Sequence, residues 1–226
     1  MTYEIAGVDS IIIYFSDTIS KDIYKNINNS YHNIKNSKIK GIIEVVPSYT
    51  SIYIQFDIFL YTHEEVYKKI NHLLKNNILK LELEKENIIQ IPVYYGDEVG
   101  FDLQRVAKHN NISKKEVIEI HSLKVYDLYT IGFSPAFGYM GEVDKKISTP
   151  RLESPRLKIP KNSVAIADKQ TAIYPQQSPG GWNILGRTYI DIFDKSLQNF
   201  SYFKVGDKIR FIPISKEEFL KNGGVI

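Results

Sequence analysis

The hydrophobic and polar positions in the first third of the chain follow strand and helix periods in turn. The apolar run SIIIYF (10–15) predicts a strand, and residues 20–34 then carry apolar side chains at near-helical spacing. KGIIEVVP (40–47) predicts a second strand. In SIYIQFD (51–57), every second side chain from Ile52 onward is apolar, which is the period of a half-buried strand. This order predicts a small α+β sandwich.

A second helix is expected directly after these strands. Thr62 and Glu65 have the spacing of a capping box, in which a hydroxyl and a carboxylate each bond an otherwise unpaired backbone N–H. The residues that follow form an apolar stripe on one helix face, made of Val66, Ile70, Leu73 and Leu74. The segment NNILKLELEKEN leads out of this unit. We therefore place a first domain at residues 1–86 and a second at 87–226.

The second part of the chain has a different pattern. After the strand-like IIQIPVYYG come two short helices, one around Leu103 and one opened by a capping box at Ser113 and Glu116. From residue 124 onward, strand patterns alternate with Pro/Gly turns, in KVYDLYTIGF, SVAIAD, TAIYP, TYIDIFD and KIRFIPI. Short strands without intervening helices favour a β-barrel or a sandwich. Ser215 is expected to cap a short last helix.

Composition narrows the possible functions. The 29 Lys and Arg residues against 26 Asp and Glu leave a net charge of +3, too little for the concentrated positive field with which proteins bind nucleic acid. There is no cysteine, which excludes disulfides, thiolate zinc sites and a cysteine nucleophile. The N-terminal residues do not have the pattern of a signal peptide, and no segment approaches the roughly 18 consecutive apolar residues of a membrane helix. We expect a cytoplasmic protein that binds neither nucleic acid nor membrane.

Two stretches come close to catalytic motifs but have the wrong context. GWNILGRT, which begins at Gly181, differs from the phosphate-loop pattern G-x-x-x-x-G-K-[ST] by one residue, with Arg187 in place of lysine. A phosphate loop needs small residues and a following helix, whereas this stretch holds Trp182 and precedes a strand-like segment. GFSPA is similar to a nucleophile elbow, but the proline after Ser134 has no N–H to offer an oxyanion. We expect Ser134 to be a turn residue.

The five histidines have no spacing typical of metal ligands, so no metal site is expected. His121 stands out because it lies near the end of a helix that also carries Val117 and Ile120. Two interpretations of His121 are open. It is either a residue that favours the C-terminal end of a helix or a catalytic residue.

Between residues 132 and 188, turn formers are interleaved with aromatic residues and arginines. Pro and Gly preset backbone angles and give rigid loops. Such loops could line a pocket for a small planar acid or amide, because arginine offers a forked donor to a carboxylate. In the alternative interpretation, the aromatics belong to the core and the arginines to a solvated face. The residues concerned are Phe133, Phe137, Tyr139, Trp182, Arg151, Arg156 and Arg187.

The stretch GFSPAFGYMGEVDKKISTPRLESPRLKIPKNSVAIADKQTAIYPQQSPGGWNILGRT resembles the family of 5-oxoprolinase B subunits, also labelled KipI-like or allophanate hydrolase subunit 1. The family pattern consists of motifs that this chain matches in the same order. They are G-F-x-P-G-F-x-Y-L-G, then T-P-R-x-x-x-P-R, then Q-T-G-I-Y-P-x-x-S-P-G-G-W-x-x-I-G-R-T. The resemblance extends to IPVYYGDEVGFDLQRVAKHNNISKKEVIEIH and, more weakly, to the N-terminal half. This chain has Ala136, Ala172, Asp168 and Glu142 at positions where the family often has glycine.

This resemblance implies a fold and a function. The fold is a small α+β domain followed by a cyclophilin-like β-barrel. The implied function is that of one subunit in an ATP-dependent complex that opens 5-oxoproline to glutamate, together with a companion C subunit and a larger A subunit. The complex uses ATP, and this chain alone is expected to bind no cofactor. Two other functions stay open, a regulator that binds and inhibits a sensor histidine kinase and half of a biotin-dependent carboxyltransferase.

The site predicted on this basis combines anion clamps, neutral hydrogen-bonding groups and an apolar wall. No residue looks like a nucleophile paired with its base, so the chain is expected to be inactive alone. The catalytic candidates are Arg187, Arg156, Gln170 and His121. The substrate-binding candidates are Arg151, Phe137, Tyr139, Thr171, Tyr174, Gly180, Gly181 and Trp182.

Overall fold

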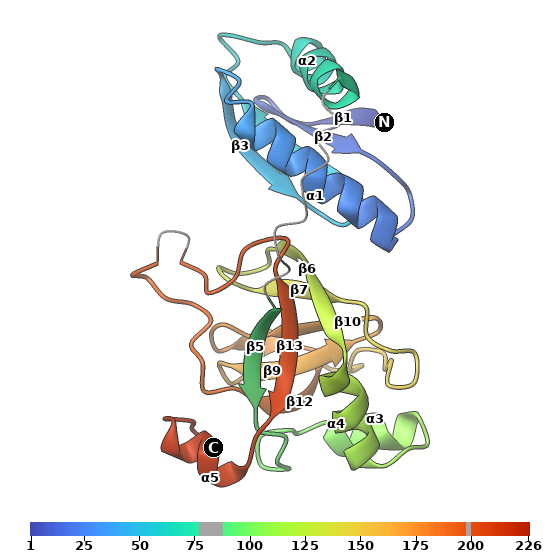
Figure 1. The fold of residues 1–226 in the computed structure, drawn as a ribbon, viewed down its shortest axis with the longest axis vertical. Helices are drawn as coiled ribbons and strands as arrows, with labels where there is room; N and C mark the ends of the chain where they lie inside the picture. Colours follow the sequence, from blue (N-terminus) through green and yellow to red (C-terminus); the bar gives the residue numbers. More distant parts are fainter. Residues whose placement is uncertain (77–87, 198–199) are drawn as a thin grey trace. The chain divides into compact units, whose positions relative to one another are not determined.

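The structure is a computed structural model that describes residues 1–76, 88–197 and 200–226 (Figure 1). The chain divides into two compact units, Met1–Lys85 and Glu86–Ile226. The predicted boundary between residues 86 and 87, and all but the first residue of NNILKLELEKEN, lie outside the described residues. In the part of the chain that is described, no helix has both the length and the apolar character needed to cross a membrane.

The first unit is a four-stranded antiparallel sheet that shares one core with two helices. Every second residue of the fourth strand, from Ile52 to Phe56, is buried in this core, as the alternation predicted. The predicted capping box is present, because the Thr62 N–H donates to Glu65 Oε2 at 2.8 Å and the Glu65 N–H to Thr62 Oγ1 at 3.3 Å. The elements are β1 (Thr2–Gly7), β2 (Ser10–Tyr14), α1 (Lys21–Asn36), β3 (Ile42–Pro47), β4 (Ser51–Phe56) and α2 (His63–Asn76), with strand order β1-β2-β4-β3.

The second unit is built on a seven-stranded sheet that closes into a barrel (Figure 1). Tyr94, directly after β5, exchanges two backbone hydrogen bonds of 2.9 Å with Arg187 at the end of β12, and this pair joins the two edge strands. The barrel strands are β5 (Ile88–Val93), β6 (Val125–Ile131), β7 (Gly138–Gly141), β9 (Ser163–Ala167), β10 (Gln170–Ile173), β12 (Asn183–Arg187) and β13 (Lys208–Pro213), in the order β12-β9-β10-β7-β6-β13-β5. The helices are α3 (Leu103–His109), α4 (Lys114–Leu123) and α5 (Lys216–Lys221).

The structure corrects part of the strand assignment. The strand predicted at TYIDIFD (188–194) is wrong, since only an isolated bridge at Phe193 lies there. The strand is β12, directly before it, so most of GWNILGRT is a barrel strand and the phosphate-loop geometry is excluded. Strands β7, β8 (Arg156–Ile159) and β11 (Ser178–Gly180) were not predicted, and the last two pair as a separate ribbon.

The two faces of the barrel wall carry different clusters. Along β9, β10 and β12, residues such as Val164, Ile173 and Leu185 point into the barrel core. Their direct neighbours in sequence belong to a second cluster, which also includes Ile159 of the ribbon. Because successive strand residues point to opposite faces, this second cluster lies on the outside of the barrel, beneath the β8–β11 ribbon. Alanines 165, 167 and 172 leave room there for large rings.

Candidate functional site

An aromatic cluster on the outside of the barrel gathers most of the predicted substrate-binding residues. Phe137 is its centre, with ring centroids 4.9 Å from Tyr139, 5.3 Å from Tyr174 and 5.7 Å from Trp182. All three contacts are edge-to-face, the geometry that aromatic quadrupoles prefer. Phe133 adds a further ring 5.3 Å from Phe137. The proposed apolar wall is therefore one packed cluster.

Gly180 and Gly181 connect this cluster to the ribbon. The backbone N–H of Trp182 donates to the Tyr174 hydroxyl, while burial raises the Tyr174 pKa to about 12, so the phenol stays neutral. A Cβ on Gly180 would meet that hydroxyl and lie 2.8 Å from Ile159 Cδ1, so any side chain here would force Tyr174 or Ile159 to shift. At Gly181 the nearest atom would be 3.5 Å away, an ordinary contact.

Arg151 projects from a loop that is anchored on both sides. The carbonyl of Pro150 accepts hydrogen bonds from Asn183 Nδ2 at 3.0 Å and from Arg105 Nη1 at 3.2 Å. The N–H of Leu152 donates to the Gly181 carbonyl at 2.7 Å. The Arg151 guanidinium carbon lies 5.8 Å from the Trp182 ring centroid, within range of a cation–π contact. No hydrogen bond or ion pair joins this guanidinium to any of the described residues.

Arg156, a second predicted anion clamp, already holds a carboxylate. Its Nη1 and Nη2 each donate to one oxygen of Asp102 at 2.8 Å. The same carboxylate accepts the backbone N–H of Ile184 at 2.8 Å. Asp102 is buried at the start of α3, so this pair ties β8 to the barrel. The arrangement gives Arg156 a structural contact and leaves Arg151 as the exposed guanidinium beside the cluster.

Arg187 points away from the aromatic cluster. Its side chain is only 7% exposed, and its Nη1 donates to the carbonyl of Val225 at 2.8 Å. Its buried Nε has no hydrogen-bond partner among the residues that the structure describes. Burial lowers the pKa of Arg187, because no carboxylate among the described residues offsets the desolvation of its charge. The structure thus separates Arg187 from Arg151.

His121 and Thr171 lie on the other side of the barrel wall, within the core. His121 is fully buried, with Nε2 3.0 Å from Thr171 Oγ1 and Nδ1 2.8 Å from the Tyr95 hydroxyl. Because the Thr171 hydroxyl donates to the carbonyl of Ala165, its oxygen accepts a hydrogen bond from the His121 Nε2–H. His121 Nδ1 then accepts a hydrogen bond from the Tyr95 hydroxyl. The ring also stacks on Phe211 at 4.6 Å.

This environment fits neither of the two interpretations of His121. Desolvation lowers the pKa of the imidazole to about 3, so the ring is neutral at neutral pH. A neutral ring gains no charge interaction with the helix end. A fully enclosed ring has no access to a substrate. His121 is therefore a hydrogen-bonded core residue.

The structure also places Gln170 and Ser134. Gln170 begins β10, where it pairs with Gly141 and Ala167. Ser134 lies in a turn closed by its carbonyl and the Phe137 N–H at 3.1 Å, as predicted. Among residues 1–76, 88–197 and 200–226, no group of three His, Cys, Asp or Glu side chains is placed to hold a metal ion.

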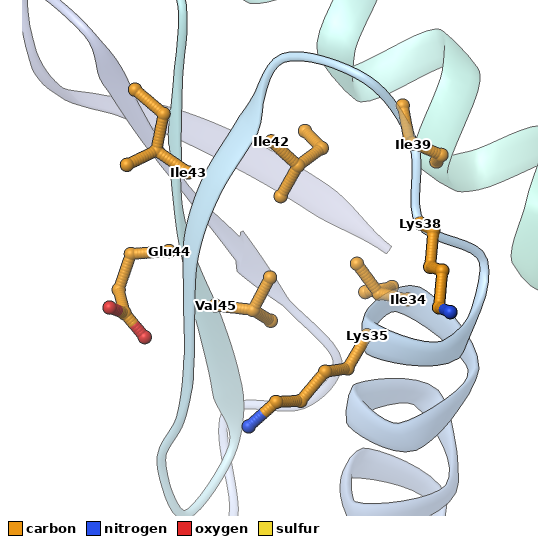
Figure 2. A pocket seen from close by; sticks show the side chains of 8 residues that line it. All are labelled: Ile34, Lys35, Lys38, Ile39, Ile42, Ile43, Glu44 and Val45. Atoms are coloured by element: carbon orange, nitrogen blue, oxygen red, sulfur yellow. The ribbon is translucent and has the colours of Figure 1, made fainter.

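A pocket of about 130 Å³ lies in the first unit, between the end of α1 and β3 (Figure 2). Four isoleucines, a valine and the charged residues Lys35, Lys38 and Glu44 line it. Lys35 Nζ donates to the Tyr31 hydroxyl at 3.0 Å. None of the predicted site residues lines this pocket.

Two backbone positions bear on the departures from the family pattern. Ala136 has φ 66° and Asp168 has φ 50°, left-handed conformations in which glycine carries no steric penalty. Both stand where the motif resemblance expects glycine. Asp102, Asn183 and Arg105 could not be found as supporting residues in the sequence, because their partners lie far away in the chain.

The fold and the site together define a class of protein: a small α/β sandwich joined to a closed β-barrel that carries a packed aromatic cluster and an exposed arginine on its outside. The chain belongs to the family described as carboxyltransferase domain, subdomain C and D, which matches residues 1–203. It is 33% identical over 223 residues to a protein named as the B subunit of 5-oxoprolinase from Bacillus subtilis (strain 168), across 94% of this chain and 92% of that one. The resemblance found in the motifs is confirmed.

Two solved structures support the same assignment. The conserved uncharacterized protein PH0987 from Pyrococcus horikoshii is 38% identical, with a TM-score of 0.58 over 96% of this chain and 100% of its own. The protein TTHA0988 is 27% identical, with a TM-score of 0.78 over 91% of this chain. This chain spans only 40% of the length of TTHA0988.

Proposed function

We propose that this chain is the B subunit of an ATP-dependent 5-oxoprolinase that opens the lactam of 5-oxoproline to glutamate. The observation that carries the proposal is the match, along nearly the whole of both chains, to a protein named as the B subunit of 5-oxoprolinase. The companions are a C subunit and a larger A subunit. We further propose that the complex uses ATP and is cytoplasmic.

The site supports a role in binding rather than an autonomous active site. Opening a lactam needs its carbonyl activated and its carboxylate held still. Arg151 and the aromatic cluster can position an anion, but His121 is enclosed in the core and Ser134 lies in a turn. The chain therefore contributes orientation, and activation of the carbonyl takes place on a companion subunit.

The same face has the features of a partner surface. Phe133 is 65% exposed beside the aromatic cluster, and Leu157 is 87% exposed on β8, the strand whose Ile159 belongs to that cluster. Large apolar side chains held in water on a rigid surface are typical of protein interfaces. We propose that both side chains are covered by a companion subunit.

Replacing both exposed residues tests this surface. The double variant Phe133→Ser/Leu157→Ser should lose association with the companion subunits in light scattering while its thermal unfolding stays unchanged, since neither side chain is buried. Phe59→Ser is the matched control, because Phe59 is 92% exposed but lies in the first unit. If the double variant still associates fully with the companion subunits, this face is not the interface.

The function itself is tested by glutamate release. The companion subunits are incubated with 5-oxoproline and ATP, with and without this chain. The proposal predicts glutamate only when the chain is present. If the proteins associate and no glutamate forms, the 5-oxoprolinase assignment fails.

A carboxyltransferase half is the second candidate, because the family description names that activity. It predicts carboxyl transfer that depends on a biotinylated carrier protein, which the same preparation can test. The third function, inhibition of a sensor histidine kinase, stays a prediction that no contact among the described residues favours.

A further inference from the structure

We propose that Arg151 binds the carboxylate of the substrate, presented by Trp182 beneath it and by a loop anchored on both sides. The inference rests on the proposed function for the identity of the substrate, 5-oxoproline. The chemistry it requires is more general: a small ring compound that carries one carboxylate.

The first argument is that Arg151 differs from the other arginines of this face in having an unsatisfied fork. Arg156 holds Asp102 through both Nη atoms, and Arg105 is used by the Pro150 carbonyl and by Asn183. Among the described residues, the Arg151 guanidinium contacts the Trp182 ring and makes no hydrogen bond or ion pair. A guanidinium stacked on a ring keeps its edge N–H groups available for the two oxygens of a carboxylate.

The second argument is that the backbone on both sides of Arg151 is held in place before any ligand arrives. The residue before it is held through its carbonyl by Asn183 and Arg105, and the residue after it through its N–H by Gly181. Trp182 is 5% exposed and locked among Phe137 and Tyr139. Its ring is therefore support for the guanidinium and not a surface for the ligand. Such preorganisation removes much of the ordering cost of binding.

The third argument concerns the surrounding groups. Burial raises the pKa values of Tyr139 and Tyr174, and the positive charge of Arg151 lowers them by less. Both phenols therefore stay neutral near the cation. No carboxylate among the described residues pairs with Arg151, although Glu153 lies two residues away. The local field therefore favours an incoming anion.

The chain provides its own reporter for this site. Trp182 is its single tryptophan and lies directly beneath Arg151, so tryptophan emission reports events there. The isolated chain is titrated with 5-oxoproline and, at equal ionic strength, with 2-pyrrolidinone, the same lactam without the carboxylate. We expect a saturable change in emission with 5-oxoproline only, and none in Arg151→Gln. Arg151→Lys keeps the charge without the fork and should bind with intermediate affinity.

Lys158→Gln is the control, because Lys158 is an exposed cation on the neighbouring β8. It should respond like the wild type. A wild-type chain that does not respond, or an Arg151→Gln chain that responds like the wild type, would overturn the assignment. Circular dichroism of each variant confirms that the fold is retained.

The reconstituted enzyme provides a second measurement. Loss of one charge-assisted bidentate contact should raise the KM for 5-oxoproline about 10- to 100-fold in Arg151→Gln and leave turnover of 2-pyrrolidinone unchanged. An unchanged KM overturns the role of Arg151 and leaves the proposed function standing. If the fluorescence responds but the reconstituted enzyme releases no glutamate, the carboxylate site is present and the 5-oxoprolinase assignment is wrong.

Discussion

Acidification should destabilise the barrel through His121, a residue with no access to solvent. The unfolded imidazole has a pKa near 6.5, whereas burial lowers the folded value to about 3. Between these values the unfolded chain binds a proton that the folded chain does not. Stability is therefore fully present above the unfolded pKa and is lost as the pH falls through the window.

The magnitude follows from the size of this window. Each pH unit within it corresponds to about 1.4 kcal/mol in the free energy of unfolding, so the loss at pH 4 is roughly 3 kcal/mol. This is a large part of the roughly 5–15 kcal/mol by which a domain is stable.

Urea unfolding at several pH values between 7 and 4, followed by Trp182 emission, measures the barrel unit separately from the first unit. His121→Gln does not titrate, so its free energy of unfolding should fall less steeply with pH than that of the wild type. His109→Gln removes an exposed histidine and should keep the wild-type slope. Carboxylates contribute equally to all three chains and cancel in the comparison. Parallel curves for wild type and His121→Gln would refute the account of a buried neutral ring.

Two further changes test the supports of the site, each by urea unfolding. Arg156→Ala leaves the buried Asp102 carboxylate with one backbone donor and should cost about 2–4 kcal/mol; an effect below about 1 kcal/mol would show that the pair is not a structural contact. Gly180→Ala drives a methyl group into the Tyr174 hydroxyl and Ile159 and should cost about 1–3 kcal/mol. Gly181→Ala should be nearly neutral, and equal effects at the two glycines would contradict the packing described.

The parts of the fold that could be predicted are those in which local pattern and burial agree. Strand β4 alternates strictly because one face is buried, and α2 and α4 begin at capping boxes whose bonds are local. Strand β1 was missed because it is an edge strand with mostly exposed residues and no alternation to detect. The ribbon strands are short and contain proline and glycine, so their pattern is that of a loop.

The error at residues 188–194 has a related cause. YIDIFD alternates in polarity, but the residues with strand geometry are Asn183–Arg187, all of them buried. A strand buried on both faces has no alternation, because one side of β12 packs in the barrel and the other under the ribbon.

The site could be predicted only in part. The aromatic residues and Arg151 are close in sequence to turn formers, and the structure brings them together. The roles of Arg156 and His121 depend on partners far away in the chain. Arg156 pairs with Asp102, 54 residues away, and His121 bonds Thr171, 50 residues away. No local pattern contains that information. The sequence could therefore not show whether Arg156 is an anion clamp or part of a structural ion pair, or whether His121 is a catalytic residue or a core residue.

The central claim is that this chain is an obligatory, non-catalytic subunit of a 5-oxoprolinase. The most direct measurement titrates the chain into fixed amounts of the companion subunits with 5-oxoproline and ATP, and follows the rate of glutamate formation. The account predicts that no glutamate forms when this chain is left out. The rate of glutamate formation should rise as the chain is added and reach a plateau at a fixed ratio of subunits. Glutamate formed at the full rate without the chain, or by the chain alone, would contradict it.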